Sequence, residues 1–153
     1  MTSWAVVDAG VLLASVLPNE PLSRQADALL QSWSETEVMP AAPVLLHYEI
    51  AAVIRKYVHR GVLTADEGRQ ACDLLLAYPV RLLVSEALVR RGYELASHFG
   101  LSAAYDAQYL AVADHLQCDL WTADRRLFSV IQHELPRVHW LGAYPLSTGS
   151  GQS

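Results

Sequence analysis

Four acidic residues of the sequence lie among apolar neighbours, namely Asp8, Glu49, Asp106 and Asp124. Asp8 ends the apolar run at residues 4–7, and Asp124 follows a second apolar run at residues 120–123. A carboxylate beside apolar surface is unfavourable unless something compensates its charge. No comparable set of apolar-flanked Lys or Arg accompanies these acids, so they indicate a divalent cation as the compensating charge.

Glu49 and Asp106 are predicted to lie on helices that are apolar around them. The positions three and four residues from Glu49 are occupied by Leu45, Leu46, Ala52 and Val53. A helix normally turns Glu to water, so this setting places Glu49 on the packing side. Asp106 falls in the first turn of its predicted helix, where the helix dipole favours an anion.

Convergence of the four acids would create strong repulsion. At a separation of ~5 Å, each pair of like charges repels by about 3 kcal/mol. Protonation of some acids or binding of a divalent ion relieves the repulsion. A site made only of oxygen ligands suits Mg²⁺ or Mn²⁺, and such an ion can activate water and stabilise charge on a phosphate. Thr122 is a candidate supporting hydroxyl that orients one of the carboxylates.

Composition limits the class of protein. The chain has 153 residues, of which 52% are hydrophobic and 18% charged, which excludes a disordered chain. A net charge of -5 argues against a broad basic surface that holds long nucleic acid, but it permits a nuclease that binds a short segment through metal. Two cysteines without metal or redox spacing fit a reducing compartment. No signal peptide or membrane span is predicted, so we expect a cytoplasmic protein.

Apolar runs alternate with helical patterns along the whole chain. Strands are predicted at residues 4–7, 38–41, 80–84, 120–123 and 138–141. Helices are predicted at residues 10–17, 22–33, 44–59, 65–77, 86–98, 103–116 and 125–134, with Thr64, Ser85, Ser102 and Asp124 as N-caps. This order predicts an α/β fold of three layers (α/β/α) around a mainly parallel sheet of four to five strands.

Two further expectations concern the ends and edges of this fold. The strand at residues 38–41 is predicted to be peripheral because it contains Pro40. Residues 1–145 are predicted to form one domain, followed by a flexible C-terminal tail at residues 146–153.

In parallel sheets of this kind, ligands bind beyond the carboxyl ends of the strands, where the strand order reverses. Asp8 and Asp124 both follow the carboxyl end of a predicted strand. If these two strands are neighbours, the two carboxylates meet in one crevice.

The segments that carry the acids resemble a known family. Residues 7–9, 49–61, 105–111 and 120–127 are similar to PIN domains, and most similar to the VapC-type toxins of prokaryotic toxin–antitoxin pairs. The similarity spans about residues 4–141. It implies that Asp8, Glu49, Asp106 and Asp124 form the acidic set, with Thr122 as the strand-end hydroxyl. It also implies a metal-dependent endoribonuclease, a cognate antitoxin whose tail enters the site, and a homodimer.

One position departs from that family pattern. The family often has Ser or Thr two residues after the first Asp, and this chain has Gly10. The missing hydroxyl keeps open a catalytically weak or inactive PIN-fold binding module as an alternative. A metal-dependent phosphatase or DNA nuclease is a further alternative, because the same acids serve all phosphate chemistry of this type.

Several cationic residues are candidates for contact with RNA or with a protein partner. Arg125 and Arg126 directly follow Asp124 and are possible contacts for a substrate phosphate or an antitoxin carboxylate. A basic cluster ends the helix at residues 44–59, where it also suits the helix dipole. The apolar surface of the helices at residues 44–59 and 65–77 is a candidate for dimer or antitoxin contact.

Other chemistries find little support in the sequence. The six histidines show no paired spacing with an acid that would suit zinc. Asp114 and Asp119 fit surface positions. The sequence contains no Gly-rich phosphate loop and no Gly-x-Ser-x-Gly elbow, which argues against a nucleotide-dependent ATPase and a serine hydrolase.

Overall fold

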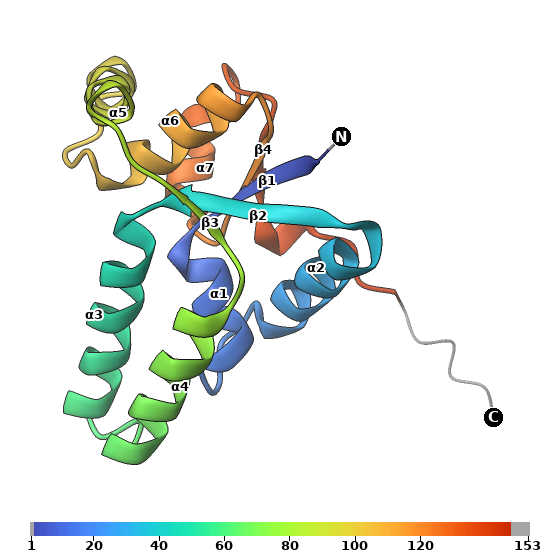
Figure 1. Ribbon diagram of the computed structural model, residues 1–153, viewed down its shortest axis with the longest axis vertical. Coiled ribbons are helices and arrows are strands. Elements are labelled where there is room, and N and C mark those ends of the chain that lie inside the picture. The colour runs from blue at the N-terminus through green and yellow to red at the C-terminus, as the bar shows by residue number, and fades with distance from the viewer. Residues whose placement is uncertain (1, 148–153) are drawn as a thin grey trace.

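The computed structural model describes residues 2–147, and in it five parallel strands form one sheet (Figure 1). The strands are β1 (Ser3–Val7), β2 (Val38–Pro43), β3 (Arg81–Leu83), β4 (Asp119–Thr122) and β5 (Val138–Trp140). Their order across the sheet is β3-β2-β1-β4-β5. The predicted α/β class with a parallel sheet is therefore confirmed. Most of the predicted tail, residues 148–153, lies outside the described residues, so the domain boundary at residue 145 stays a prediction.

Helices cover both faces of the sheet. They are α1 (Ala9–Val16), α2 (Ser23–Thr36), α3 (Leu45–His59), α4 (Ala65–Ala77), α5 (Glu86–His98), α6 (Tyr105–Leu116) and α7 (Arg125–Ile131), followed by the 3-10 turn η1 (Leu141–Ala143). Figure 1 shows α1 to α4 on one side of the sheet and α5 to α7 on the other. Right-handed crossovers require this change of side when the chain returns from β3 to β4. Between residues 2 and 147, no helix is long and apolar enough to cross a lipid bilayer.

The strand order reverses between β1 and β4. From β1 the chain moves outward to β2 and β3, and then it returns to place β4 on the other side of β1. Val6 pairs with Leu120 and Val7 pairs with Trp121 in this central ladder. The residues that follow the two strands therefore leave the sheet at the same edge, as the crevice hypothesis requires.

The centre of the sheet is fully buried. Val6, Val7 and Leu120 are fully buried, as expected for parallel strands that are covered on both faces. Helix α6 packs across β1, β2 and β4, and it presents the fully buried Ala107 and Ala111 one turn apart. These small side chains let α6 lie close to the strands, which brings its first turn to the carboxyl edge of the sheet.

The prediction that residues 38–41 form a peripheral strand is wrong. Strand β2 lies inside the sheet, between β1 and β3. Pro40 pairs with Ala5 of β1, whereas β3 pairs only with the part of β2 from Ala41 to Pro43. At Pro40 the strand therefore has a neighbour on one side only, so the missing N–H need not interrupt a ladder.

Two predicted helix ends differ from the structure. Ser102 does not cap α6, which begins after Ala104 without a side-chain cap. Helix α7 ends at Ile131 instead of continuing to residue 134. The Ile131 carbonyl accepts hydrogen bonds from the N–H groups of Glu134 and Leu135, so the chain tightens into a turn before it enters β5.

The capping box of α4 provides a test of these helix ends. Thr64 Oγ accepts from the Glu67 N–H at 3.1 Å, and Glu67 Oε1 accepts from the Thr64 N–H at 2.9 Å. We expect Thr64→Ala to lower the free energy of unfolding by about 1 kcal/mol. Ser102→Ala is the matched control and should change it by less than about 0.5 kcal/mol, because Ser102 caps no helix. Urea unfolding followed by circular dichroism measures both, and equal losses would contradict the observed caps.

Candidate functional site

A cavity of about 300 Å³ opens at the carboxyl edge of β1 and β4. All four acids predicted from the sequence line it: Asp8, Glu49, Asp106 and Asp124. They come from four separate parts of the fold, namely the end of β1, helix α3, the first turn of α6 and the loop after β4. None of the described residues that line this cavity is a Lys or an Arg. The four acids therefore face one space in which no side chain supplies a compensating positive charge.

Asp8 is held in place at the base of this cavity. Its Oδ2 accepts a hydrogen bond from Thr122 Oγ1 at 2.5 Å, and its Oδ1 accepts from the Val11 N–H at 3.0 Å. The Ala123 N–H lies 3.3 Å from Oδ2 and adds a third donor. The bond from Val11 makes Asp8 the N-cap of α1. The carboxylate thus has a single orientation before any ligand binds.

Thr122 connects the two central strand ends. Its side chain is fully buried, donates to Asp8, and accepts from the Asp124 N–H at 3.0 Å. A buried hydroxyl needs such partners, because an unsatisfied polar group inside a protein is unfavourable. The structure therefore places Thr122 where a hydroxyl can orient the acids, as expected from the sequence.

Asp124 serves as the N-cap of α7, as predicted. Its Oδ1 accepts from the N–H groups of Arg126 and Leu127 at 2.9 and 3.1 Å. Both of these bonds go to the same oxygen. The second oxygen remains able to accept a ligand, so the capping role and a ligand-binding role are compatible.

Glu49 is positioned by a residue that the sequence reasoning missed. Tyr109 is only 2% exposed, and its hydroxyl donates to Glu49 Oε1 at 2.9 Å. Tyr109 lies one turn after Asp106 on α6, so this bond ties α3 to the helix that carries another acid. A Tyr within an apolar helix stripe usually has a hydrogen-bond partner for its hydroxyl. The sequence could therefore have indicated that the Tyr109 hydroxyl has a partner, but not that the partner is Glu49.

The pKa shifts report the close approach of the acids. Burial, together with the charge of Glu49, raises the pKa of Asp8 from 3.8 to about 6, even though hydrogen bonds from Thr122 and the backbone act in the opposite direction. Burial and the charge of Asp106 raise the pKa of Glu49. Partial burial and the charge of Asp124 raise the pKa of Asp106. Each acid thus makes ionisation of a neighbour less favourable.

The residues fit a hard divalent cation by their chemistry. The donors are carboxylate oxygens, the charge is uncompensated by side chains, and the walls around them are apolar at Leu13, Val53 and Leu127. Within residues 2–147, no three His, Cys, Asp or Glu side chains are grouped closely enough to enclose one ion as they stand. Ion binding therefore requires side-chain adjustment, for which Asp106 and Asp124 at the exposed mouth have room.

Gly10 has a packing reason in this fold. A Cβ atom at Gly10 would lie 2.9 Å from the Cβ of Ala123 and 3.4 Å from Asp8 Oδ1. The first turn of α1 therefore rests directly against the loop after β4. A Ser or Thr at this position would require Ala123 to shift, so Gly10 permits the close approach of two segments that carry site residues.

The two arginines after Asp124 behave differently. The guanidinium carbon of Arg125 lies 4.9 Å from the centroid of the Trp140 ring, within the range of a cation–π interaction. Arg126 is exposed, and its side chain forms no ion pair with the described part of the chain. The basic cluster at the end of α3, formed by Arg55, Lys56, His59 and Arg60, does not line the acid cavity.

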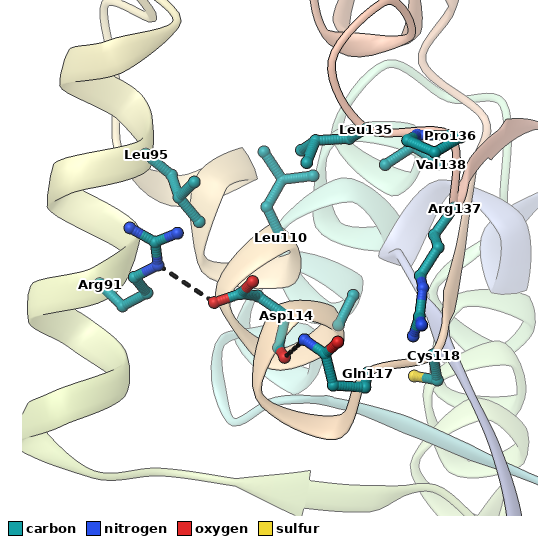
Figure 2. A pocket seen from close by; sticks show the side chains of 11 residues that line it. Arg91, Leu95, Leu110, Asp114, Gln117, Cys118, Leu135, Pro136, Arg137 and Val138 are labelled. Atoms are coloured by element: carbon teal, nitrogen blue, oxygen red, sulfur yellow. Dashed lines mark hydrogen bonds and ion pairs between the residues drawn. The ribbon is translucent and has the colours of Figure 1, made fainter.

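A second cavity, of about 210 Å³, lies at the opposite edge of the sheet (Figure 2). There Asp114 pairs with Arg91 at 3.1 Å, and Leu95, Leu110 and Leu135 supply apolar walls. Asp114 is thus a surface acid, as predicted, and the structure adds Arg91 as its partner. It does not line the cavity of the four acids. Asp119 likewise has a partner, His139, at 3.4 Å.

Comparison with known proteins places this arrangement in a family context. The sequence model of one family, described as PIN domain, matches residues 5–133. A VapC ribonuclease of Mycobacterium bovis is 34% identical over 131 residues, which cover 86% of this chain and 94% of that protein. A ribonuclease of Pyrobaculum aerophilum named VapC3 is 31% identical over 124 residues, covering 80% of this chain and 90% of the relative.

Solved structures share the fold. A crystal structure of a Pyrobaculum aerophilum protein aligns with a TM-score of 0.66 at 21% identity, covering 93% of each chain. A chain of a toxin–antitoxin complex from Klebsiella pneumoniae aligns with a TM-score of 0.63 at 19% identity, covering 88% of this chain and 95% of that one. At these identities the two structures support the fold alone.

The raised pKa of Asp8 generates a prediction on stability. A carboxyl group whose pKa is higher in the folded state stabilises the fold when protonated, so its contribution is full below pH 3.8 and is lost as the pH rises through about 6. Without metal, we expect Asp8→Asn to gain up to about 3 kcal/mol relative to wild type between these limits. Urea unfolding in chelator at pH 4 and pH 7 measures the difference.

Asp27→Asn is the matched control for this measurement. Asp27 is exposed on α2 and belongs to none of the ion pairs described for residues 2–147. Its substitution should leave the pH dependence of unfolding as in wild type. An Asp8→Asn protein with the wild-type pH dependence would show that Asp8 is already ionised at pH 4.

Proposed function

Because the chain belongs to the PIN-domain family, we propose that it is a metal-dependent endoribonuclease of the VapC type, the toxin of a toxin–antitoxin pair. Its VapC relatives are named ribonucleases, and they align over most of both chains. The observation that carries the proposal is the cavity in which four carboxylates gather without a Lys or Arg among the described lining residues. A site of this kind suits a divalent ion and, through that ion, a phosphate.

The acids have distinct parts in the proposed reaction. Asp8, Asp106 and Asp124, with Glu49, would hold Mg²⁺ or Mn²⁺ in the cavity. A bound ion of this type supplies an activated water and stabilises the charge that develops on the phosphodiester. Asp8 keeps one orientation through its bonds to Thr122 and the backbone, so reorientation on binding is left to the acids at the mouth.

Electrostatics sets the order of binding. Without a cation, the cavity presents up to four negative charges to a polyanion, and the partial burial of Asp8 and Glu49 strengthens that field. RNA therefore enters only after the charge has been compensated. The apolar walls at Leu13, Val53 and Leu127 exclude water from one side of the cavity, which makes each remaining charge interaction stronger.

The partners follow from the same proposal. We expect an RNA substrate, a cognate antitoxin and a cytoplasmic site of action. Helices α3 and α4 expose Tyr48 and Leu74, which are 74% and 62% exposed, and this apolar surface supports a role in contact with a second copy or with the antitoxin. Light scattering at micromolar concentration tests the expected homodimer, and a monomer would contradict it.

Cleavage is the direct test of the proposal. We expect purified protein to cut a mixed pool of tRNA and rRNA into discrete fragments in Mn²⁺ and to lose this activity in chelator. Asp8→Asn should lower the rate by at least about 100-fold, because it removes a proposed metal ligand, while Asp27→Asn should cut like wild type. Cleavage that persists in chelator and in Asp8→Asn would overturn the four-acid site. Parallel assays with phosphate monoesters and with DNA test the alternatives, a phosphatase and a DNA nuclease. A ribonuclease should cut neither of these substrates.

Thermal melting separates an ion-binding site from an inert PIN-fold module. At about 100 times the dissociation constant, Mn²⁺ should stabilise the fold by about 2.7 kcal/mol and raise the melting temperature by about 5 to 10 °C. Tyr109→Phe should reduce this shift, because Glu49 loses the hydroxyl that orients it. Tyr57→Phe is the control, since the Tyr57 hydroxyl bonds to Glu20 away from the cavity. If the melting temperature does not change with Mn²⁺, the alternative of an inactive PIN-fold binding module is favoured.

A further inference from the structure

Arg125 and Trp140 form a pair beside the acid cavity. Arg125 is the first residue of α7 and directly follows Asp124. Trp140 ends β5, and in the parallel ladder it is the partner of Thr122. Because Thr122 bonds to Asp8 and Asp124, this register places Trp140 one strand away from the carboxylates. The Arg125 guanidinium lies over the Trp140 ring, 4.9 Å from its centroid.

The Trp140 ring has its position set by packing. A Cβ atom at Gly142 would lie 2.2 Å from a carbon of the indole, so the ring occupies the space that any larger residue at 142 would need. The indole Nε1 is buried and has no hydrogen-bond partner among the described residues. The Trp140 ring is therefore held by packing against Gly142 and Arg125 and not by a hydrogen bond. In this position its face supports the Arg125 guanidinium.

Arg125 combines the lack of an ion pair, which it shares with Arg126, with a contact to an aromatic ring. Arg69, Arg90 and Arg91 each pair with a carboxylate, whereas Arg125 has no such partner among residues 2–147. The helix dipole does not explain why an Arg stands at position 125, because the first turn of a helix disfavours a cation. Arg125 is thus a restrained cation whose charge is not used within the described fold.

We propose that Arg125, held on the Trp140 ring, binds a phosphate of the RNA strand next to the phosphodiester that enters the acid cavity. The inference rests on the proposed ribonuclease function. Guanidinium groups bind phosphate oxygens through several N–H donors, and these remain available when the face of the group rests on an aromatic ring. Restraint by Trp140 lowers the conformational entropy that Arg125 loses when RNA binds.

Arg125 would also supply positive charge near a cavity that is strongly negative. The cavity concentrates negative charge and has no cationic side chain among its described lining residues. A flanking phosphate therefore requires a positive group at the rim. Arg125 is next to Asp124 in the chain and fixed by Trp140, which makes it the cation that can meet the strand without entering the ion site.

Salt dependence of RNA binding tests this contact. With Asp8 intact and Mn²⁺ present, we would measure binding of a labelled single-stranded RNA at several salt concentrations by stopped-flow fluorescence anisotropy, before cleavage sets in. Arg125→Gln should weaken binding by about 10-fold and lower the slope of log affinity against log salt by about 0.7, the value for one phosphate contact on a single strand. Arg24→Gln on α2 and the remote Arg137→Gln are charge-matched controls and should change affinity by less than about 2-fold, because neither residue lines the acid cavity.

Variants of Trp140 test the supporting ring. Trp140→Leu should reproduce part of the loss seen with Arg125→Gln, and Trp140→Phe should restore binding because an aromatic face remains. Circular dichroism and the melting-temperature shift in Mn²⁺, measured with Asp8 intact, check that each variant is folded and still binds the ion. In kinetic assays of the cutting enzyme, Arg125→Gln should act mainly on KM, with a smaller effect on kcat.

The outcomes separate this inference from the function on which it rests. If wild type cuts RNA but Arg125→Gln loses no more affinity than Arg24→Gln and Arg137→Gln, the inference is wrong and the ribonuclease proposal stands. If Arg125→Gln weakens binding of a short polyglutamate peptide but leaves the RNA slope unchanged, Arg125 is a contact for an acidic protein segment and the inference is also wrong. If wild type neither cuts RNA nor responds to Mn²⁺, the proposed function fails first.

Discussion

Four carboxylates share one cavity in this fold, and no cationic side chain among the described lining residues offsets them. Each acid raises the energy of ionising a neighbour, as the raised pKa values of Asp8, Glu49 and Asp106 report. The rest of the domain must hold these groups together against their repulsion. Val6, Val7 and Leu120 of the central strands are fully buried. The favourable free energy of burying this apolar core offsets the repulsion between the carboxylates at the edge of the sheet.

Rigidity is distributed unevenly over the site. Asp8 is held by Thr122 and by backbone donors, and Glu49 is held by the buried Tyr109. Asp106 and Asp124 lie at the exposed mouth, although Asp124 also caps α7 through one of its two oxygens. A base of fixed carboxylates and a mouth of adjustable ones would suit the proposed capture of a small ion, because few side chains would have to be reordered.

Much of the site could be predicted from local patterns, because an acid at the end of an apolar run is visible without any knowledge of the fold. The meeting of Asp8 and Asp124 required one further assumption, that their strands are neighbours, and the ladder between β1 and β4 confirms it. Long-range contacts could not be predicted in this way. Tyr109 and Glu49 are 60 positions apart, and their bond depends on how α3 and α6 pack.

The wrong predictions share a cause with the missed contacts. Ser102 has the side chain of an N-cap, but the loop before α6 turns into the helix only after Ala104. Pro40 is typical of an edge strand, but the short β3 leaves room for it inside the sheet. In both cases a residue preference was overridden by the geometry of a neighbour that the local sequence does not reveal. The support of Arg125 by Trp140 is likewise hidden, since it depends on the register between β4 and β5.

The return of the chain from β3 to β4 has a consequence for the order in which the protein is made. Asp8 leaves the ribosome before its hydrogen-bond partner Thr122, which follows 114 positions later. Strand β4 is therefore missing from every nascent chain that has not yet passed α6, and such a chain has neither Asp124 nor the ladder that would hold Asp8 beside it. An enzyme that would cut RNA beside the ribosome that makes it thus stays without its site until β4 and Asp124 have been made.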